Sequence, residues 1–270
     1  IELPHMMYRR VANHLFDNKT EADEYYDALR YRRISVATPQ LMNYGSERGS
    51  GISCNITSLI DDSKEGILET LRITSLASSD GSGIGNHIHN IRSKETMVSS
   101  FKGFAGGVVR YCDMLQSHMR FFKQGNRSGS AAVYLGVWHR DIEDFLELRL
   151  QVGEERKRTR DLFTAVCIPD LFYEKLNAND DSWFVFCPHE VKEAGFPPLY
   201  DCFGDDFKKL YNQLVEYGLG REVSLKKIWN MLLTSQSESG LPYTFNWCNA
   251  NKFNPQSNIG IRRGSNLCIE

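Results

Sequence analysis

The stretch Ala131-Ala-Val-Tyr-Leu-Gly-Val-Trp138 is an apolar run about as long as one strand, and it decides the fold class. Before it, residues 106–122 carry apolar side chains at spacings of three and four, which predicts a helix with one buried stripe. After it, residues 141–150 show a second amphipathic pattern. A buried strand between two amphipathic helices is typical of an α/β fold.

The same alternation of helices and strands continues on both sides of this unit. The segments expected on this basis are helices at residues 20–33, 62–77, 205–217 and 225–233, and strands at residues 34–38, 163–168 and 183–187. Strands that alternate with helices predict α/β architecture with largely parallel strands.

Two glycine-rich segments interrupt this pattern. Residues 42–55 read as a polar loop that ends near Cys54. Residues 78–85 leave two interpretations open, because such a loop can be a plain connector or can offer backbone N–H groups to a phosphate. The glycine spacing is not that of a dinucleotide-binding fingerprint, and a helix precedes it where that fingerprint needs a strand.

The last five residues, Asn266-Leu-Cys-Ile-Glu270, place an amide, a thiol and a carboxylate two residues apart. In an extended backbone this spacing puts the three polar groups on one face, with Leu267 and Ile269 packed behind. A thiol can carry redox chemistry, and a neighbouring carboxylate can exchange a proton. The alternative is that Cys268 is a small buried apolar residue, as single cysteines often are.

The composition is that of an ordinary globular protein, with 270 residues, 41% of them apolar, and a formal net charge of -2. This charge balance argues against a nucleic-acid-binding surface, which needs concentrated positive charge. No apolar stretch approaches the length of a membrane span, and the N-terminus has no signal-peptide pattern. We therefore expect a cytoplasmic protein that does not engage membranes or nucleic acid.

The seven cysteines include no Cys-x-x-Cys pair, which fits neither a disulfide framework nor a zinc site. Most should be reduced and buried, as Cys112 is expected to be on its apolar helical stripe. His87-x-His89 and Cys187-Pro-His189-Glu190 contain ligand-type residues, but neither has a second cluster to complete a tetrahedral site. We therefore predict no metal ligands in the chain.

Taken in order along nearly the whole chain, the motifs resemble the large, catalytic subunit of class I ribonucleotide reductase. The matching motifs are Ala37-Thr-Pro39, Ser53-Cys54, Asp62-Ser63-x-Glu65-Gly66-Ile67, Gly83-Ile-Gly85, Gln124-Gly-Asn-Arg127, Trp138-His139-x-Asp141-Ile142, Cys187-Pro-His-Glu190 and Ser265-Asn-Leu-Cys-x-Glu270. The resemblance implies a short helical segment, residues 1–33, followed by the first half of a ten-stranded α/β barrel, residues 34–270.

The resemblance also implies reduction of ribonucleoside diphosphates by thiyl-radical chemistry. In this reading Cys268 carries the transient radical, Glu270 takes the 3′-hydroxyl proton, Asn266 orients the sugar, and Cys54 is the first of two reducing cysteines. The residues that match substrate-binding positions are Thr38, Ser53, Asn266 and Glu270.

A second implied site binds an allosteric deoxynucleoside triphosphate or ATP at a dimer interface. Arg127 falls in the mobile loop between effector and substrate, where a guanidinium can bridge to a base or phosphate. Ser79 and segment 93–105 depart from the family pattern, which leaves effector preference open. The residues that match effector ligands are Asp62, Ser63, Lys64, Arg92, Ser99 and Ser100.

The implied partners are nucleotide substrates, a radical-generating, metal-containing small subunit, a second large subunit, and thioredoxin or glutaredoxin as reductant. No cofactor is expected to bind this chain directly. The second reducing cysteine and the radical-relay tyrosines are absent, so we expect the chain to need the C-terminal half of the subunit and to be inactive alone. Two alternatives remain open: a class II relative that uses adenosylcobalamin, and a non-catalytic nucleotide-binding module.

Overall fold

The computed structural model describes residues 1–47, 49–98, 103–122 and 129–269. Its main sheet has five parallel strands in the order β1-β2-β5-β6-β9. These strands are β1 (Cys54–Ser58), β2 (Gly83–His87), β5 (Ala131–Gly136), β6 (Phe163–Ile168) and β9 (Tyr243–Asn246). The predicted α/β fold with parallel strands is confirmed. The sheet is consistent with the first half of the expected barrel, and the described residues form no closed barrel.

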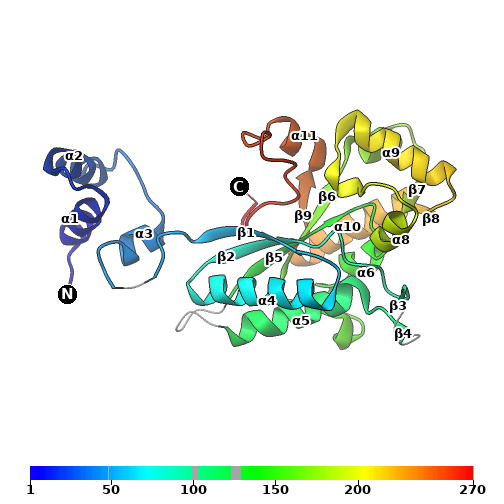
Figure 1. Cartoon of the computed structure of the whole chain (residues 1–270), viewed down its shortest axis with the longest axis horizontal. Coiled ribbons are helices and arrows are strands. Elements are labelled where there is room, and N and C mark those ends of the chain that lie inside the picture. Colours follow the sequence, from blue (N-terminus) through cyan, green and yellow to red (C-terminus); the bar gives the residue numbers. More distant parts are fainter. Residues whose placement is uncertain (48, 99–102, 123–128, 270) are drawn as a thin grey trace.

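Helices connect the strands and cover one face of the sheet, where α4 and α5 run side by side (Figure 1). The helices after β1 are α4 (Lys64–Ser79), α5 (Gly107–Phe121), α6 (Ile142–Leu146), α7 (Asp170–Asn177), α8 (Pro188–Glu193), α9 (Gly204–Glu216), α10 (Leu225–Ser239) and α11 (Trp247–Lys252), with 3-10 turns at Glu155–Lys157 and Leu199–Asp201. Side chains alternate across a strand, so Asn86 of β2 reaches this covered face and donates to the Tyr111 hydroxyl of α5 at 3.3 Å.

The core confirms the buried strand and the helical stripe on which the fold class is based, whereas the helix expected over residues 141–150 is shorter, at Ile142–Leu146. Every residue of β5 is buried, and α5 buries the predicted stripe, including Val108, Cys112 and Leu115. Among the described residues, no helix is both long enough and apolar enough to cross a lipid bilayer.

Two small antiparallel ribbons lie outside the main sheet. They are β3 (Met97–Val98) with β4 (Gly103–Phe104), and β7 (Ser182–Val185) with β8 (Arg221–Ser224). The strand expected at residues 183–187 therefore exists, but it does not belong to the parallel sheet. The place next to β6 is taken by β9, which arrives much later in the chain.

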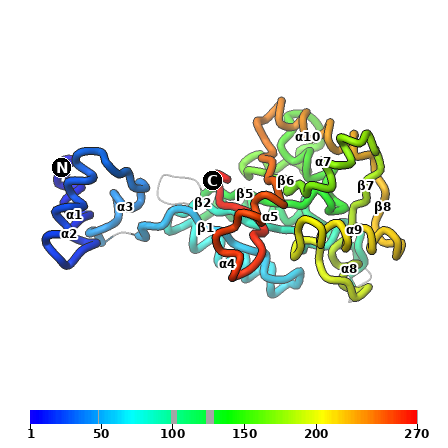
Figure 2. The backbone as a smooth tube through the Cα atoms, turned by 90° about the horizontal axis from the view of Figure 1, so that it is seen from above, coloured from blue at the N-terminus to red at the C-terminus, as the bar shows by residue number. Residues whose placement is uncertain are grey.

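The chain begins with three helices that stand apart from the sheet (Figures 1 and 2). They are α1 (Pro4–Leu15), α2 (Lys19–Arg30) and α3 (Thr38–Asn43), and the Arg10 guanidinium of α1 donates to the Leu41 carbonyl of α3 at 2.9 Å. The strand expected at residues 34–38 is wrong, because Pro39 lies in the first turn of α3, where a helix tolerates proline. The domain boundary between residues 33 and 34 stays a prediction.

Candidate active site

The terminal segment, defined here as residues 261–269, lies on the sheet face opposite α4 and α5. A Cβ added to Gly85 would lie 1.8 Å from the Ser265 carbonyl oxygen, and one added to Gly83 would lie 2.7 Å from Leu267 Cδ2. Only glycine lets two backbones approach this closely. The loop expected at these two glycines is wrong, since both belong to β2 and make room for the terminal segment.

The extended conformation expected at the chain end is also wrong. Residues 267–268 form a turn, and Ile269 has a left-handed backbone with φ of 66°. The predicted packing of Leu267 and Ile269 against the core is confirmed. Cys268 is exposed, so it is not the buried apolar residue of the alternative reading. The polar side chains of the terminal segment are therefore oriented by contacts with the sheet, and not by the alternation of side chains along an extended strand.

Cys54 opens β1 beside the terminal segment. It is paired with Gly83, the same glycine that Leu267 covers. Paired residues of neighbouring strands, about 4.8 Å apart, carry their side chains on the same face, so the Cys54 thiol lies on the face that holds the terminal segment. The thiol is exposed, and its Sγ lies 3.8 Å from the Ser53 Oγ. The structure therefore brings Ser53 and Cys54 to the segment that carries Cys268.

Thr38 is not brought to this place. It is exposed at the first position of α3, and α3 packs against α1, away from the sheet (Figure 1).

Two buried side chains that the sequence reasoning missed hold the terminal segment. The Tyr134 hydroxyl of β5 donates to the Asn266 carbonyl oxygen at 2.6 Å. His89 Nδ1 accepts from the Gly136 N–H at 3.0 Å, so Nε2 carries the proton and donates to the Arg263 carbonyl oxygen at 2.7 Å. Burial lowers the pKa of His89 to about 3, which keeps the ring neutral.

The sequence offered only weak signals for these two anchors. Tyr134 carries the one hydroxyl within the apolar run 131–138, and His89 belongs to the His87-x-His89 pair of ligand-type residues. The two imidazole rings stack with centroids 5.3 Å apart, and both are buried. Among the described residues, no group of three or more His, Cys, Asp or Glu side chains is placed to hold a metal ion.

The residues that match effector ligands meet at the start of α4. Ser63 caps this helix by accepting the Gly66 N–H at 3.0 Å. Arg92 Nε donates to Asp62 Oδ2 at 2.6 Å, and its Nη2 donates to the Asp62 carbonyl at 3.0 Å. Burial raises the pKa of Asp62, while the hydrogen bond from Arg92 opposes this rise. Asp62, Ser63, Lys64 and Arg92 line one cavity of about 420 Å³ with apolar walls.

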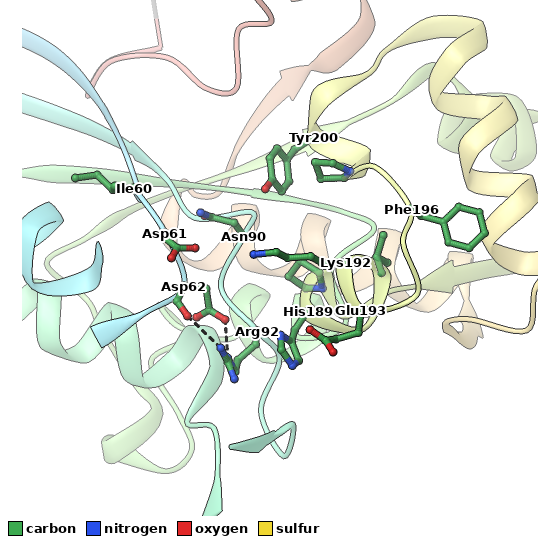
Figure 3. Close-up of a pocket in the computed structure, with 13 residues that line it drawn as sticks. Ile60, Asp61, Asp62, Asn90, Arg92, His189, Lys192, Glu193, Phe196 and Tyr200 are labelled. Atoms are coloured by element: carbon green, nitrogen blue, oxygen red, sulfur yellow. Dashed lines mark hydrogen bonds and ion pairs between the residues drawn. The ribbon is translucent and has the colours of Figure 1, made fainter. Parts of the chain in front are cut away.

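A second cavity, of about 480 Å³, lies on the other side of the same ion pair. Figure 3 shows Arg92 directed at Asp62, with Asn90, His189 and Lys192 around the space beyond them. The motif 187–190 contains ligand-type residues beside this cavity. The structure instead uses Glu190 for an ion pair with Arg140 of the segment after β5.

Four predicted site residues cannot be placed in this geometry. Ser99, Ser100, Arg127 and Glu270 lie outside the described residues.

Comparison with known families gives matches over almost the entire chain. Residues 52–270 match the family model for the barrel domain of ribonucleotide reductase, and residues 1–49 match the model for its all-alpha domain. The chain is 37% identical over 274 residues to the ribonucleoside-diphosphate reductase large subunit of Arabidopsis thaliana. It is also 37% identical over 273 residues to the large chain of Schizosaccharomyces pombe.

Both matches cover 100% of this chain but 33% of the relative, so the chain spans about a third of the length of these relatives. The chain is also 36% identical over 275 residues to the ribonucleoside-diphosphate reductase large subunit of vaccinia virus. This match again covers 100% of this chain and 35% of the relative. The predicted resemblance is confirmed, and the chain belongs to the large-subunit family of ribonucleotide reductase.

Proposed function

We propose that this chain supplies two of the reacting thiols of a class I ribonucleoside-diphosphate reductase, which converts ribonucleoside diphosphates to deoxyribonucleoside diphosphates. The observation that carries the proposal is the shared position of Cys54 and the Cys268 segment on one open sheet face. Thiols on an accessible face suit a reaction in which one sulfur activates the sugar and another supplies electrons.

In the proposed cycle Cys268 acts as a thiyl radical and removes the 3′ hydrogen atom of the ribose. Glu270 accepts the 3′-hydroxyl proton, and the 2′-hydroxyl leaves as water with a proton from one reducing thiol. The other reducing thiol gives the hydrogen atom that replaces the hydroxyl on C2′. The sulfurs of Cys54 and a second cysteine of the complete subunit then join as a disulfide and pass their extra electron to the oxidised C3′ centre. Glu270 returns its proton to the 3′ oxygen, and Cys268 returns its hydrogen atom to C3′. The net change is one water and one disulfide formed for each deoxynucleotide.

Substrate positioning falls to the terminal segment and the residues around Cys54. The Ser265 hydroxyl donates to Asn266 Oδ1 at 3.4 Å, which leaves the amide N–H groups of Asn266 to donate to a substrate hydroxyl. Ser53 lies next to Cys54 and suits a diphosphate or ribose contact. Thr38 joins this proposal through the family resemblance alone.

The cavity at the start of α4 is the proposed site for a deoxynucleoside triphosphate or ATP effector. Arg92 and Lys64 suit the phosphates, and the apolar wall that includes Ile67 and Met114 suits a base. Ser99, Ser100 and Arg127 extend this assignment by resemblance.

The proposed partners follow from the same assignment. A second large subunit would pack on the outer face of α4, where Leu68 and Leu76 are 64% and 55% exposed. A metal-containing small subunit would supply the radical, and thioredoxin or glutaredoxin would reduce the disulfide in a cytoplasmic setting. The family assignment implies that further residues of a complete large subunit are needed for turnover.

The test is reduction of cytidine diphosphate by the chain assembled with a polypeptide for the remaining part of a large subunit, a small subunit and a reductant. Cys268→Ala should abolish product. Cys54→Ser should stop repeated turnover, because the reducing disulfide cannot form. Cys202→Ser is the matched control: its thiol donates only to the Leu199 carbonyl at 3.4 Å, a bond a hydroxyl can replace, and it should keep normal activity. Normal turnover in Cys268→Ala would contradict the proposal.

The assay also separates the two alternatives. Deoxynucleotide binding without any product would favour a non-catalytic nucleotide-binding module. Activity that needs adenosylcobalamin in place of the small subunit would favour a class II enzyme. The relatives named as ribonucleoside-diphosphate reductase large subunits favour class I.

A further inference from the structure

The terminal segment must be held by contacts other than a strand ladder. Residues 261–266 have no regular secondary structure, and the backbone turns at residues 267–268. A sulfur on such a segment keeps a fixed position only if neighbouring groups restrain the backbone, because each unrestrained residue retains conformational entropy.

Tyr134 is placed to provide that restraint close to Cys268. Its hydroxyl donates at 2.6 Å to the Asn266 carbonyl oxygen, which belongs to the peptide that joins Asn266 to Leu267, two residues before the cysteine. Its ring also supports the start of this stretch, since a Cβ added to Gly264 would lie 3.1 Å from Tyr134 Cγ. One side chain therefore contacts the terminal segment at two points.

The tyrosine itself is rigidly held. It is fully buried in β5, between His87 of β2 and Ala165 of β6 in the strand register. Its ring meets Phe245 edge to face, with centroids 5.9 Å apart. The hydroxyl is thus fixed to the centre of the sheet.

The chemistry of the site keeps this hydroxyl a donor. Burial raises the pKa of Tyr134 and the neighbouring Cys167 adds to the rise, which outweighs the opposing effect of a hydrogen bond with the Ser265 side chain. The phenol therefore stays protonated at neutral pH and can donate to the Asn266 carbonyl throughout a catalytic cycle.

We propose that Tyr134 is a positioning residue, which fixes the Cys268 sulfur relative to the sugar and to Cys54 through its hydrogen bond to the Asn266 carbonyl. This inference rests on the proposed reductase function. A small displacement of a reacting atom lowers the rate steeply, because the reaction needs a near-attack geometry. Loss of the Tyr134 hydrogen bond would therefore shift the reacting sulfur and leave the binding of the substrate diphosphate unchanged.

The first experiment is Tyr134→Phe in the 270-residue chain, read by NMR. Asn266-Leu267 is the only Asn-Leu pair in the sequence, so ¹³C-carbonyl asparagine with ¹⁵N-leucine labels this one peptide. The Asn266 carbonyl signal should move upfield when its hydrogen bond is lost. Tyr173→Phe is the matched control, because its hydroxyl donates to Asn246 Oδ1 at 3.1 Å, and the signal should stay in place. An unchanged signal in Tyr134→Phe overturns the proposal.

The second experiment measures kcat and KM in the assembled enzyme. Tyr134→Phe should lower kcat roughly 5- to 10-fold, the effect of one lost hydrogen bond, with KM unchanged. A kcat equal to that of Tyr173→Phe, or a raised KM with normal kcat, overturns the positioning role. If the unaltered assembly makes no product, the proposed function fails, whereas the NMR result still decides whether Tyr134 holds the terminal segment.

Discussion

The cavity at the start of α4 and the thiol-bearing face are built in different ways. In the cavity, Asp62, Ser63 and Lys64 are consecutive residues at a helix start, and Arg92 and residues of α5 such as Met114 complete the lining. The thiol-bearing face combines the start of β1, two strands of the central sheet and the terminal segment. The residues that line the cavity are different from those that hold the terminal segment, so single substitutions should damage one region and spare the other.

The largest expected effect is a loss of nucleotide affinity at the cavity at the start of α4. Arg92→Met removes a charged donor and leaves Asp62 half-buried without its partner. Deoxynucleoside triphosphate affinity, measured by calorimetry, should fall about 10- to 100-fold, the range for a lost charged hydrogen bond. Arg72→Met, which breaks an exposed ion pair with Glu69 on α4, should leave affinity near normal. Equal losses in the two variants would contradict the assigned role of Arg92.

The next effect tests the terminal segment. Gly85→Ala places a Cβ where the Ser265 carbonyl lies, so either the segment or β2 must shift. Urea unfolding should show a loss of about 2 kcal/mol, as for other overpacked sites, and the Asn266-Leu267 NMR signal should move. Gly103→Ala is the control, because a Cβ there meets nothing within 4 Å. Unchanged stability and an unmoved signal would mean that the terminal segment does not rest on β2.

The smallest effect is a dependence of stability on pH that comes from His89. The folded pKa of His89 is about 3, below its ordinary value of 6.5, so its contribution to stability is complete above pH 6.5 and is lost as pH falls towards 3. From pH 6.5 to 5, the unaltered chain should lose about 1.5 kcal/mol more stability than His89→Gln.

This loss is measured by urea unfolding at the two pH values. His5→Gln, at an exposed position in α1, should behave like the unaltered chain. Because His89 holds Arg263, acid should disturb the Asn266-Leu267 signal before it weakens nucleotide binding at Arg92. If nucleotide binding weakened at a higher pH than the one at which the NMR signal changes, His89 would not make the terminal segment the more acid-sensitive region.

The sequence predicted the parts of the fold whose signals are local. The apolar run became β5, the stripe of residues 106–122 became α5, and the helix expected at residues 225–233 became α10. Such elements can be predicted because a buried face places apolar residues at regular spacings along the sequence.

The parts that were missed depend on contacts between distant residues. Gly83 and Gly85 carry no strand pattern, and their role becomes visible only when the terminal segment packs on them. The same limit explains why Tyr134 was read as an ordinary core residue. In the candidate site, the resemblance singles out Cys54 and Cys268, and the fold places their segments side by side. The anchors Tyr134 and His89 are identified only by their contacts in the folded chain.

The register between β1 and β2 constrains how the start of this sheet can move. Cys54 alternates with Asn55 across the strand, so a slip by a single residue would turn the sulfur to the helix-covered face and present an amide in its place. β1 therefore cannot slide gradually along β2 and keep the thiol on the same face. Any signal that reaches the thiol from the Asp62 end must arrive as a tilt or a bend of β1, or travel through the loops around it.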